Sequence, residues 1–136
     1  MLRRRGIVAL LAVAIAAASV MALGGVGAAR STKPKVVYVC DDYYGAHKTC
    51  DGQQAGTVKI PKRGKVKWQW TPVFNNHNVK LTKAPRGVTK SQFRSQTSSS
   101  PDYSFTKRFK KPGRYHFICT IHPVQMQMDV KVRRPS

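Results

Sequence analysis

Acidic side chains are scarce in this sequence. Its 136 residues contain five Asp and Glu against 25 Lys and Arg, which gives a formal net charge of +20 and a pI near 10.7. Such a balance first suggests nucleic acid or an anionic surface as a partner. No recognisable nucleic-acid-binding motif accompanies the charge, so the charge alone does not define a function.

Cysteine and histidine are also few, with three and four residues respectively. These numbers are too small for a disulfide-dense miniprotein but sufficient for one metal site. Hydrophobic residues make up 41% of the chain, which argues against disorder. The length suits a single globular domain.

No segment after residue 35 has a sustained helical period. Apolar and polar side chains alternate instead, and turn residues such as Pro61–Gly64 and Pro112–Gly113 separate the runs. This pattern predicts an all-β antiparallel sandwich with one long loop, Thr82–Asp102, which Val88 and Phe93 pin down. The residues of shared parity are Val37 and Val39; Val66, Trp68 and Trp70; His77, Val79 and Leu81; Tyr103, Phe105 and Phe109; Tyr115, Phe117 and Cys119; Met126, Met128, Val130 and Val132.

The N-terminal residues have the layout of an export signal. Three arginines, Arg3–Arg5, precede an apolar stretch, Ile7–Leu23, and then small residues. We expect a signal peptide over 1–28, a flexible leader over 29–35 and the folded domain over 36–136. An uncleaved membrane anchor is the alternative, and the choice between general and twin-arginine export stays open. Either way the domain is expected outside the cytoplasm, in a periplasm, a cell envelope or the medium.

Chemistry-bearing side chains concentrate near the C-terminus. Cys119, His122 and Met126 fall within eight residues, and Cys119 ends an alternating strand. His77 supplies a second imidazole from another strand. One Cys, two His and a weak axial Met are the ligand set of a blue-copper site, in which thiolate and thioether favour Cu(I) and imidazole accepts Cu(II). Zinc is disfavoured because only one thiol is available and Met is a poor zinc ligand.

At these residues the sequence resembles the cupredoxin family. Asn76–Val79 is similar to the segment that carries the family's first His ligand, with Asn76 in place of Pro. Pro112–Cys119 and Cys119–Pro123 are similar to its Cys-bearing strand and its ligand loop. The resemblance implies a Greek-key β-sandwich of seven to eight strands that transfers one electron and is not an enzyme. It also implies that Asn78 braces the ligand loop by hydrogen bonding.

The spacing of the axial ligand departs from the family pattern. Members of the family keep two or four residues between this His and Met, whereas three residues separate His122 from Met126 here and five separate it from Met128. Both methionines have the same parity. We choose Met126, because it belongs to the loop, and keep Met128 as the alternative.

Cys40 and Cys50 are expected to form a disulfide, the default state of paired thiols in an exported protein. The alternative is a second metal site in which His47 and Asp41 or Asp42 join the two cysteines. His116 points away from Cys119 by alternation and is expected on the outer face.

These observations predict an exported one-electron carrier with one copper ion. The alternative is an extracytoplasmic copper-binding protein without a dedicated electron-transfer role. Without the three arginines of the signal, the remaining 22 basic and five acidic side chains give a net charge of +17. This charge suits redox proteins with an acidic docking surface, or anionic cell-envelope polymers or lipid headgroups. We expect a monomer that does not bind nucleic acid.

Overall fold

The computed structural model describes residues 33–135, which form eight strands and one short 3₁₀ helix. The predicted signal peptide over 1–28 lies outside these residues. None of the described residues forms a helix long and apolar enough to span a membrane. In chain order the elements are β1 (Lys35–Val39), β2 (Tyr44–Gly45), β3 (Thr57–Pro61), β4 (Lys65–Trp70), β5 (Lys80–Lys83), η1 (Lys90–Gln92), β6 (Ser104–Arg108), β7 (Gly113–Ile118) and β8 (Gln127–Arg133).

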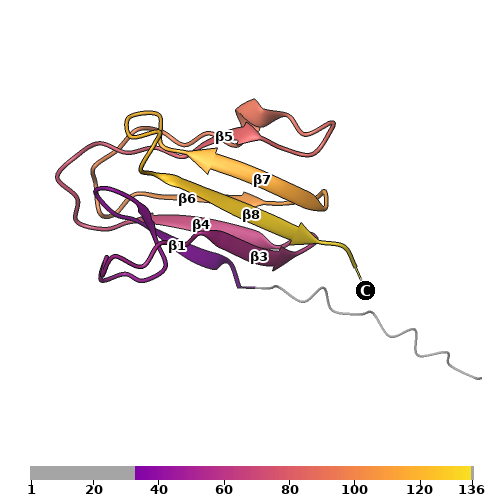
Figure 1. The fold of residues 1–136 in the computed structure, drawn as a ribbon, viewed down its shortest axis with the longest axis horizontal. Helices are drawn as coiled ribbons and strands as arrows, with labels where there is room; N and C mark the ends of the chain where they lie inside the picture. The colour runs from indigo at the N-terminus through magenta and orange to yellow at the C-terminus, as the bar shows by residue number, and fades with distance from the viewer. Residues whose placement is uncertain (1–32, 136) are drawn as a thin grey trace, which may run out of the picture. The chain divides into compact units, whose positions relative to one another are not determined.

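The strands form two four-stranded sheets, in the orders β2-β1-β4-β6 and β3-β8-β7-β5. In Figure 1, β7 and β8 lie over β6 and β4. The prediction of an all-β sandwich is therefore confirmed. The prediction that the strands are antiparallel is wrong for two pairs, because β1 pairs with β4 and β3 pairs with β8 in parallel. β3 and β4 follow each other in the chain but belong to opposite sheets. Because the connection crosses from one sheet to the other, neighbouring strands within a sheet can run in the same direction.

The core lies between the inner faces of the sheets, as the alternation predicts. Trp68 and Trp70 of β4 and Tyr115 and Phe117 of β7 are buried. The rings of Trp68 and Phe117 lie 4.9 Å apart, so they join the two sheets at the centre of the sandwich. Burial of these large rings is the main favourable contribution to folding.

The structure departs from the predicted strands in three places. β2 and β3 were not predicted, because β2 has only two residues and β3 offers only Val58 and Ile60 as buried apolar residues. His77 was expected within a strand, but β5 begins at Lys80 and His77 makes an isolated antiparallel bridge instead. β1 begins at Lys35, ahead of the alternating residues Val37 and Val39.

The long loop is held by the two residues predicted to hold it, but it begins after Lys83, because Thr82 and Lys83 belong to β5. Phe93 is buried, and Val88 is partly buried and packs against the core. The ring of Phe93 lies 5.3 Å from that of Phe109, which holds the loop against the residue that follows β6. This loop also supplies Ser98, the bridge partner of His77.

The loops that carry the predicted site residues lie at one end of the sandwich. β1 ends there at Val39, β4 ends at Trp70, β7 ends at Ile118 and β8 begins at Gln127. Pairing sets Val39 level with Trp70 in one sheet and Ile118 level with Gln127 in the other, and both pairs lie at the same end of the sandwich in Figure 1. We call this the site end of the molecule.

Candidate metal centre

Three metal-ligating side chains converge at the site end. The ligand atoms of His77, Cys119 and His122 all lie within 4.8 Å of one another. His77 and Cys119 are completely buried, whereas His122 is partly exposed. No other group of three or more His, Cys, Asp or Glu side chains within residues 33–135 is arranged to hold a metal ion.

Backbone hydrogen bonds hold the three residues in place. His77 and Ser98 exchange two N–H···O=C bonds of 2.9 Å. The N–H of Cys119 donates to the carbonyl of Met126 at 3.0 Å, and the N–H of Met126 donates to the carbonyl of His122 at 2.9 Å. The connection between β7 and β8 is therefore a closed loop that cannot easily move its side chains apart.

Two imidazole nitrogens at this site have no hydrogen-bond partner. Nδ1 of His77 and Nδ1 of His122 are buried and make no hydrogen bond, and they are the only such side-chain N or O atoms in the described part of the chain. Leaving a buried polar atom unpaired costs about 1–3 kcal/mol. Two unpaired nitrogens beside one buried thiol are accounted for if all three bind a metal ion.

The surroundings of Cys119 favour its thiolate. Burial alone raises the pKa of the thiol, but the neighbouring His77 imidazole and the backbone N–H groups of Asn78, His122 and Ile121 lower it to about 6. The thiolate is the form that binds metals. A soft sulfur anion with two imidazole nitrogens suits copper, and the residues present fit that ion.

Asn78 connects the two segments that carry the ligands. Its side-chain oxygen Oδ1 accepts the backbone N–H of Thr120 at 2.9 Å. Its side-chain nitrogen Nδ2 donates to the Thr120 hydroxyl at 2.7 Å and to the Thr97 hydroxyl at 3.0 Å. The hydroxyl of Tyr44 donates to the backbone carbonyl of Asn78 at 2.6 Å. The residue after His77 is thus tied to the residue after Cys119, as a brace between them requires.

The two methionines have different surroundings, although both are buried. Met128 is level with Phe117 inside the sheet, and its sulfur accepts the indole N–H of Trp68 at 3.2 Å. Met126 lies in the loop, bonded through its backbone to Cys119 and His122. The sulfur of Met128 is therefore engaged in the core between the sheets.

The alternative of a second metal site is wrong. Cys40 and Cys50 are bonded to each other, with Cα atoms 5.8 Å apart, as the preferred prediction requires. Nδ1 of His47 lies 2.9 Å from a carboxylate oxygen of Asp51.

His116 is half-buried, and its ring pairs with the carboxylate of Asp129 at 2.8 Å.

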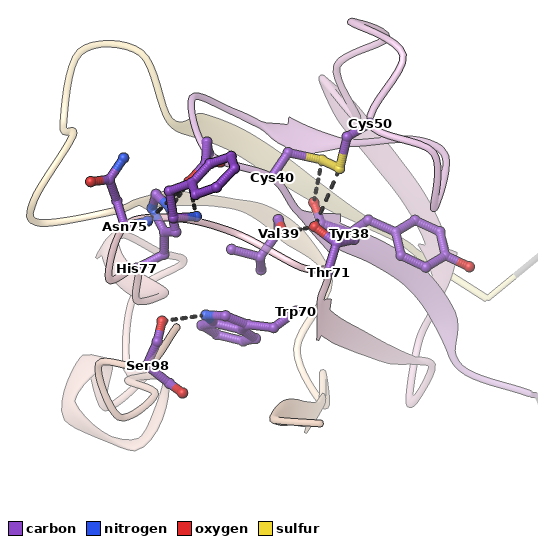
Figure 2. A network of polar contacts seen from close by, with 11 residues as sticks. Tyr38, Val39, Cys40, Cys50, Trp70, Thr71, Asn75, His77 and Ser98 are labelled. Carbon is purple, nitrogen blue, oxygen red and sulfur yellow. Dashed lines mark hydrogen bonds and ion pairs between the residues drawn. A yellow bond between two sulfur atoms is a disulfide. The ribbon is translucent and has the colours of Figure 1, made fainter. Parts of the chain in front are cut away.

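Asp41 has a contact that the sequence did not reveal. Its Oδ1 accepts the N–H groups of Phe74 and Asn75 at 2.9 and 3.1 Å and lies 3.4 Å from Nε2 of His77. Burial raises the pKa of Asp41, but the hydrogen bonds from Asn75, Phe74 and His77 outweigh it and lower the pKa below its usual value. In Figure 2, His77 and Asn75 lie on one side of the strand end and the disulfide on the other. The only signal in the sequence was that Asp41 follows Cys40.

Known proteins share this architecture. A copper-containing nitrite reductase from Thermus scotoductus SA-01 aligns over 76% of this chain and 23% of its own, with a TM-score of 0.59 and 20% identity. A reduced mutant of amicyanin aligns over 76% of this chain and 85% of its own, with a TM-score of 0.58 and 17% identity. A purple cupredoxin from Nitrosopumilus maritimus aligns over 72% of this chain and 98% of its own, with a TM-score of 0.53 and 20% identity.

These identities establish the fold alone, and the chain spans less than a quarter of the nitrite reductase. No curated protein sequence matches the chain significantly. The sequence profile of the family described as "Copper binding proteins, plastocyanin/azurin family" matches residues 53–133, more than half of the chain, from the segment before β3 to the end of β8. The chain belongs to the plastocyanin/azurin family of copper-binding proteins, the cupredoxins, and its cofactor is copper.

Proposed function

We propose that this protein is an extracytoplasmic one-electron carrier, not an enzyme, and that His77, Cys119, His122 and Met126 hold its single copper ion. The observation that carries the proposal is the convergence of two unpaired imidazole nitrogens on a buried, low-pKa thiol. When bound, copper supplies a one-electron couple between Cu(I) and Cu(II). The chain supplies a fixed, water-poor set of ligands that changes little between the two states.

The surroundings of the methionines support Met126 as the axial ligand. The Met128 sulfur already accepts the Trp68 N–H, whereas Met126 is bonded to the loop that carries two other ligands. A thioether donor at this position is weak and adjusts the potential more than it holds the ion.

Electron exchange requires that a partner protein come close to the metal site, and exposed apolar side chains indicate where it could make contact. Within residues 33–135, the exposed large hydrophobic residues are Phe74, Ile121 and Val124, with exposures of 97%, 46% and 78%. All three lie on the loops that carry His77 and His122. Exposed apolar groups near a functional centre are typical of protein–protein contacts. We therefore place the contact with redox partner proteins around the partly exposed edge of His122.

The predicted signal over residues 1–28 supports export, and the disulfide supports an oxidising compartment. Within that compartment the net positive charge favours partners with acidic surfaces, because complementary charge raises encounter rates. We expect a monomeric carrier, since the apolar exposure is confined to one small region.

Voltammetry of the copper-loaded protein tests the carrier role. A carrier with preformed ligands is expected to exchange one electron rapidly and reversibly. Slow or irreversible exchange contradicts the proposal and favours the alternative, a protein that binds copper without transferring electrons.

A further inference from the structure

Asp41 occupies a connecting position between the disulfide and the metal centre. It directly follows Cys40, which is buried and bonded to Cys50. The end of β1 is fixed to the end of β4, because the hydroxyl of Thr71 donates to the carbonyl of Val39 at 2.8 Å (Figure 2). From this fixed point the Asp41 carboxylate reaches the segment before β5.

The Asp41 carboxylate is itself held by two backbone donors, Phe74 and Asn75, at 2.9 and 3.1 Å. The same oxygen lies 3.4 Å from Nε2 of His77, whose other nitrogen, Nδ1, faces the ligand cluster. If Nδ1 binds a metal ion, Nε2 carries the ring proton. A carboxylate that accepts this proton fixes the ring's tautomer and orientation and makes the ring a stronger donor.

We propose that Asp41 is a positioning residue for His77, which holds the ring with Nδ1 toward the metal and lowers the reduction potential; this inference rests on the proposed copper site. A negative charge beside a ligand ring favours the more positive oxidation state of the metal. The carboxylate therefore strengthens Cu(II) binding more than Cu(I) binding.

The chain offers a matched control for testing Asp41. Asp41→Asn removes the charge but keeps an oxygen for the N–H groups of Phe74 and Asn75. Asp51→Asn removes the same charge from another carboxylate–histidine pair, with His47, that is exposed and outside the ligand cluster. Cu(II) affinity and reduction potential are measured for both variants and the parent protein.

We expect Asp41→Asn to weaken Cu(II) binding about 10-fold to 100-fold and to raise the potential. Asp51→Asn is expected to match the parent protein in both quantities. Equal values for all three proteins overturn the role of Asp41 and leave the copper site intact. Equal changes in both variants also overturn it, because they would show a general effect of charge. A parent protein that does not bind copper overturns the proposed function itself.

An independent observation concerns the end of the sandwich opposite the site end. β1 begins there at Lys35, β6 ends at Arg108 and β8 ends at Arg133, and pairing sets Lys65 level with Arg108 and Pro61 with Arg133. We call this the basic pole. Its basic side chains are Lys33, Lys35, Lys62, Arg63, Lys65, Arg86, Arg108, Lys110, Lys111, Arg133 and Arg134.

The basic pole has no acidic side chain. Four of the five acidic residues, Asp41, Asp42, Asp51 and Asp102, lie in connections near the site end, and Asp129 is near the start of β8, level with His116. The basic side chains are exposed except for Lys65, which is partly exposed. They are therefore free to meet an external anion.

The pole also contains a hollow. Pro61, Lys62, Arg63, Arg133, Arg134 and Pro135 line an open space of about 670 Å³. Three of these are arginines, whose planar guanidinium groups bind phosphate oxygens in pairs. The first described residue, Lys33, is also at this pole, just before the start of β1.

We infer that the basic pole binds an anionic lipid surface and turns the site end away from it. The three exposed apolar residues and the edge of His122 then face the surrounding solution, where a redox partner can reach them. Clustered Lys and Arg side chains attract anionic lipid headgroups in this way.

Sedimentation with vesicles tests the lipid surface without copper. The parent protein is compared with a pole variant, Lys62→Gln, Arg63→Gln, Arg133→Gln and Arg134→Gln. The matched control, Lys48→Gln, Lys80→Gln, Arg94→Gln and Arg114→Gln, removes the same charge from other exposed positions. The vesicles are phosphatidylcholine with and without one-third phosphatidylglycerol.

The pole variant is expected to bind the phosphatidylglycerol vesicles roughly 100-fold more weakly than the parent protein, and the control variant much less so. Equal losses in the two variants overturn the inference, because they show an effect of net charge alone. Binding that is equally strong on neutral vesicles overturns it as well. Stronger binding to a soluble polyphosphate than to the vesicles identifies a polymer partner and also overturns it.

Discussion

At the scale of single residues, the site depends on which buried atoms have partners and which do not. Nδ1 of His77 and of His122 have none, whereas the sulfur of Met128 accepts the Trp68 N–H. The two methionines have the same parity but different surroundings. One belongs to the ligand loop and the other to the core.

Replacement of the methionines one at a time tests this division. Met126→Leu is expected to raise the reduction potential, because an apolar side chain stabilises Cu(II) less than a thioether does. Met128→Leu is expected to leave the potential unchanged and to lower the free energy of unfolding by about 1–3 kcal/mol, because the Trp68 N–H loses its acceptor. Voltammetry and urea unfolding of both variants decide the assignment. A potential that moves only in the Met128 variant would reverse it.

Tyr115 gives the protein a pH dependence at the alkaline end. Burial raises the pKa of its phenol above the usual value of 10.0, while its hydroxyl donates to the carbonyl of Lys111 at 2.8 Å. The neutral phenol is thus favoured in the folded state. Its contribution to stability is fully present below pH 10 and is lost as the pH rises through the raised pKa.

Tyr115→Phe is expected to be less stable than the parent protein by about 1 kcal/mol at pH 8, because one hydrogen bond is lost. The difference should shrink above about pH 10, where only the parent protein has a phenol to ionise. Thermal unfolding of the metal-free proteins across this range measures it. A difference that stays constant to pH 11 would mean that the phenol does not ionise during unfolding.

At the scale of elements, the disulfide is the main restraint on the segment between β1 and β3. Cys40 and Cys50 close a loop that contains both Asp41 and the two-residue strand β2. Cys40→Ser with Cys50→Ser is expected to lower the free energy of unfolding by about 2–3 kcal/mol, because the unfolded chain regains freedom. Urea unfolding of the metal-free protein checks this value. An unchanged midpoint would show that packing of Tyr44 alone holds the loop.

Sequence patterns predicted the elements whose causes are local. Alternation revealed the long strands β4, β7 and β8, because half-buried strands must alternate, and the loop after Cys119 contains two neighbouring candidate ligands, His122 and Met126. The same reasoning missed β3, whose pattern is too short, and placed His77 inside a strand. Alternation alone could not separate Met126 from Met128, and Met126 was preferred because of its place in the loop. Contacts between distant segments, such as Trp68 with Met128 or Asp41 with His77, leave no periodic signal in a single sequence.

At the scale of the whole molecule, charge is distributed unevenly between the two ends. The acidic residues lie toward the site end, whereas the opposite end is basic without interruption. Like charges at one end repel one another in the folded state, and dissolved salt screens that repulsion. The uneven charge is therefore expected to cost stability at low salt.

The midpoint of thermal unfolding is accordingly expected to rise as sodium chloride increases from low to moderate concentration. The pole variant described above should show a smaller rise than the control variant, because it has lost four crowded charges. Scanning calorimetry of the metal-free proteins gives both quantities. A midpoint that falls with salt would mean that attractive ion pairs outweigh the repulsion.

The visible absorption spectrum of the copper-loaded protein tests the central claim most directly. If His77, Cys119 and His122 hold the ion, addition of Cu(II) should produce an intense thiolate-to-copper charge-transfer band at one copper per chain. Cys119→Ser should remove the band, while the parent protein keeps it. Absence of the band from the parent protein, or its survival in the serine variant, would contradict the account.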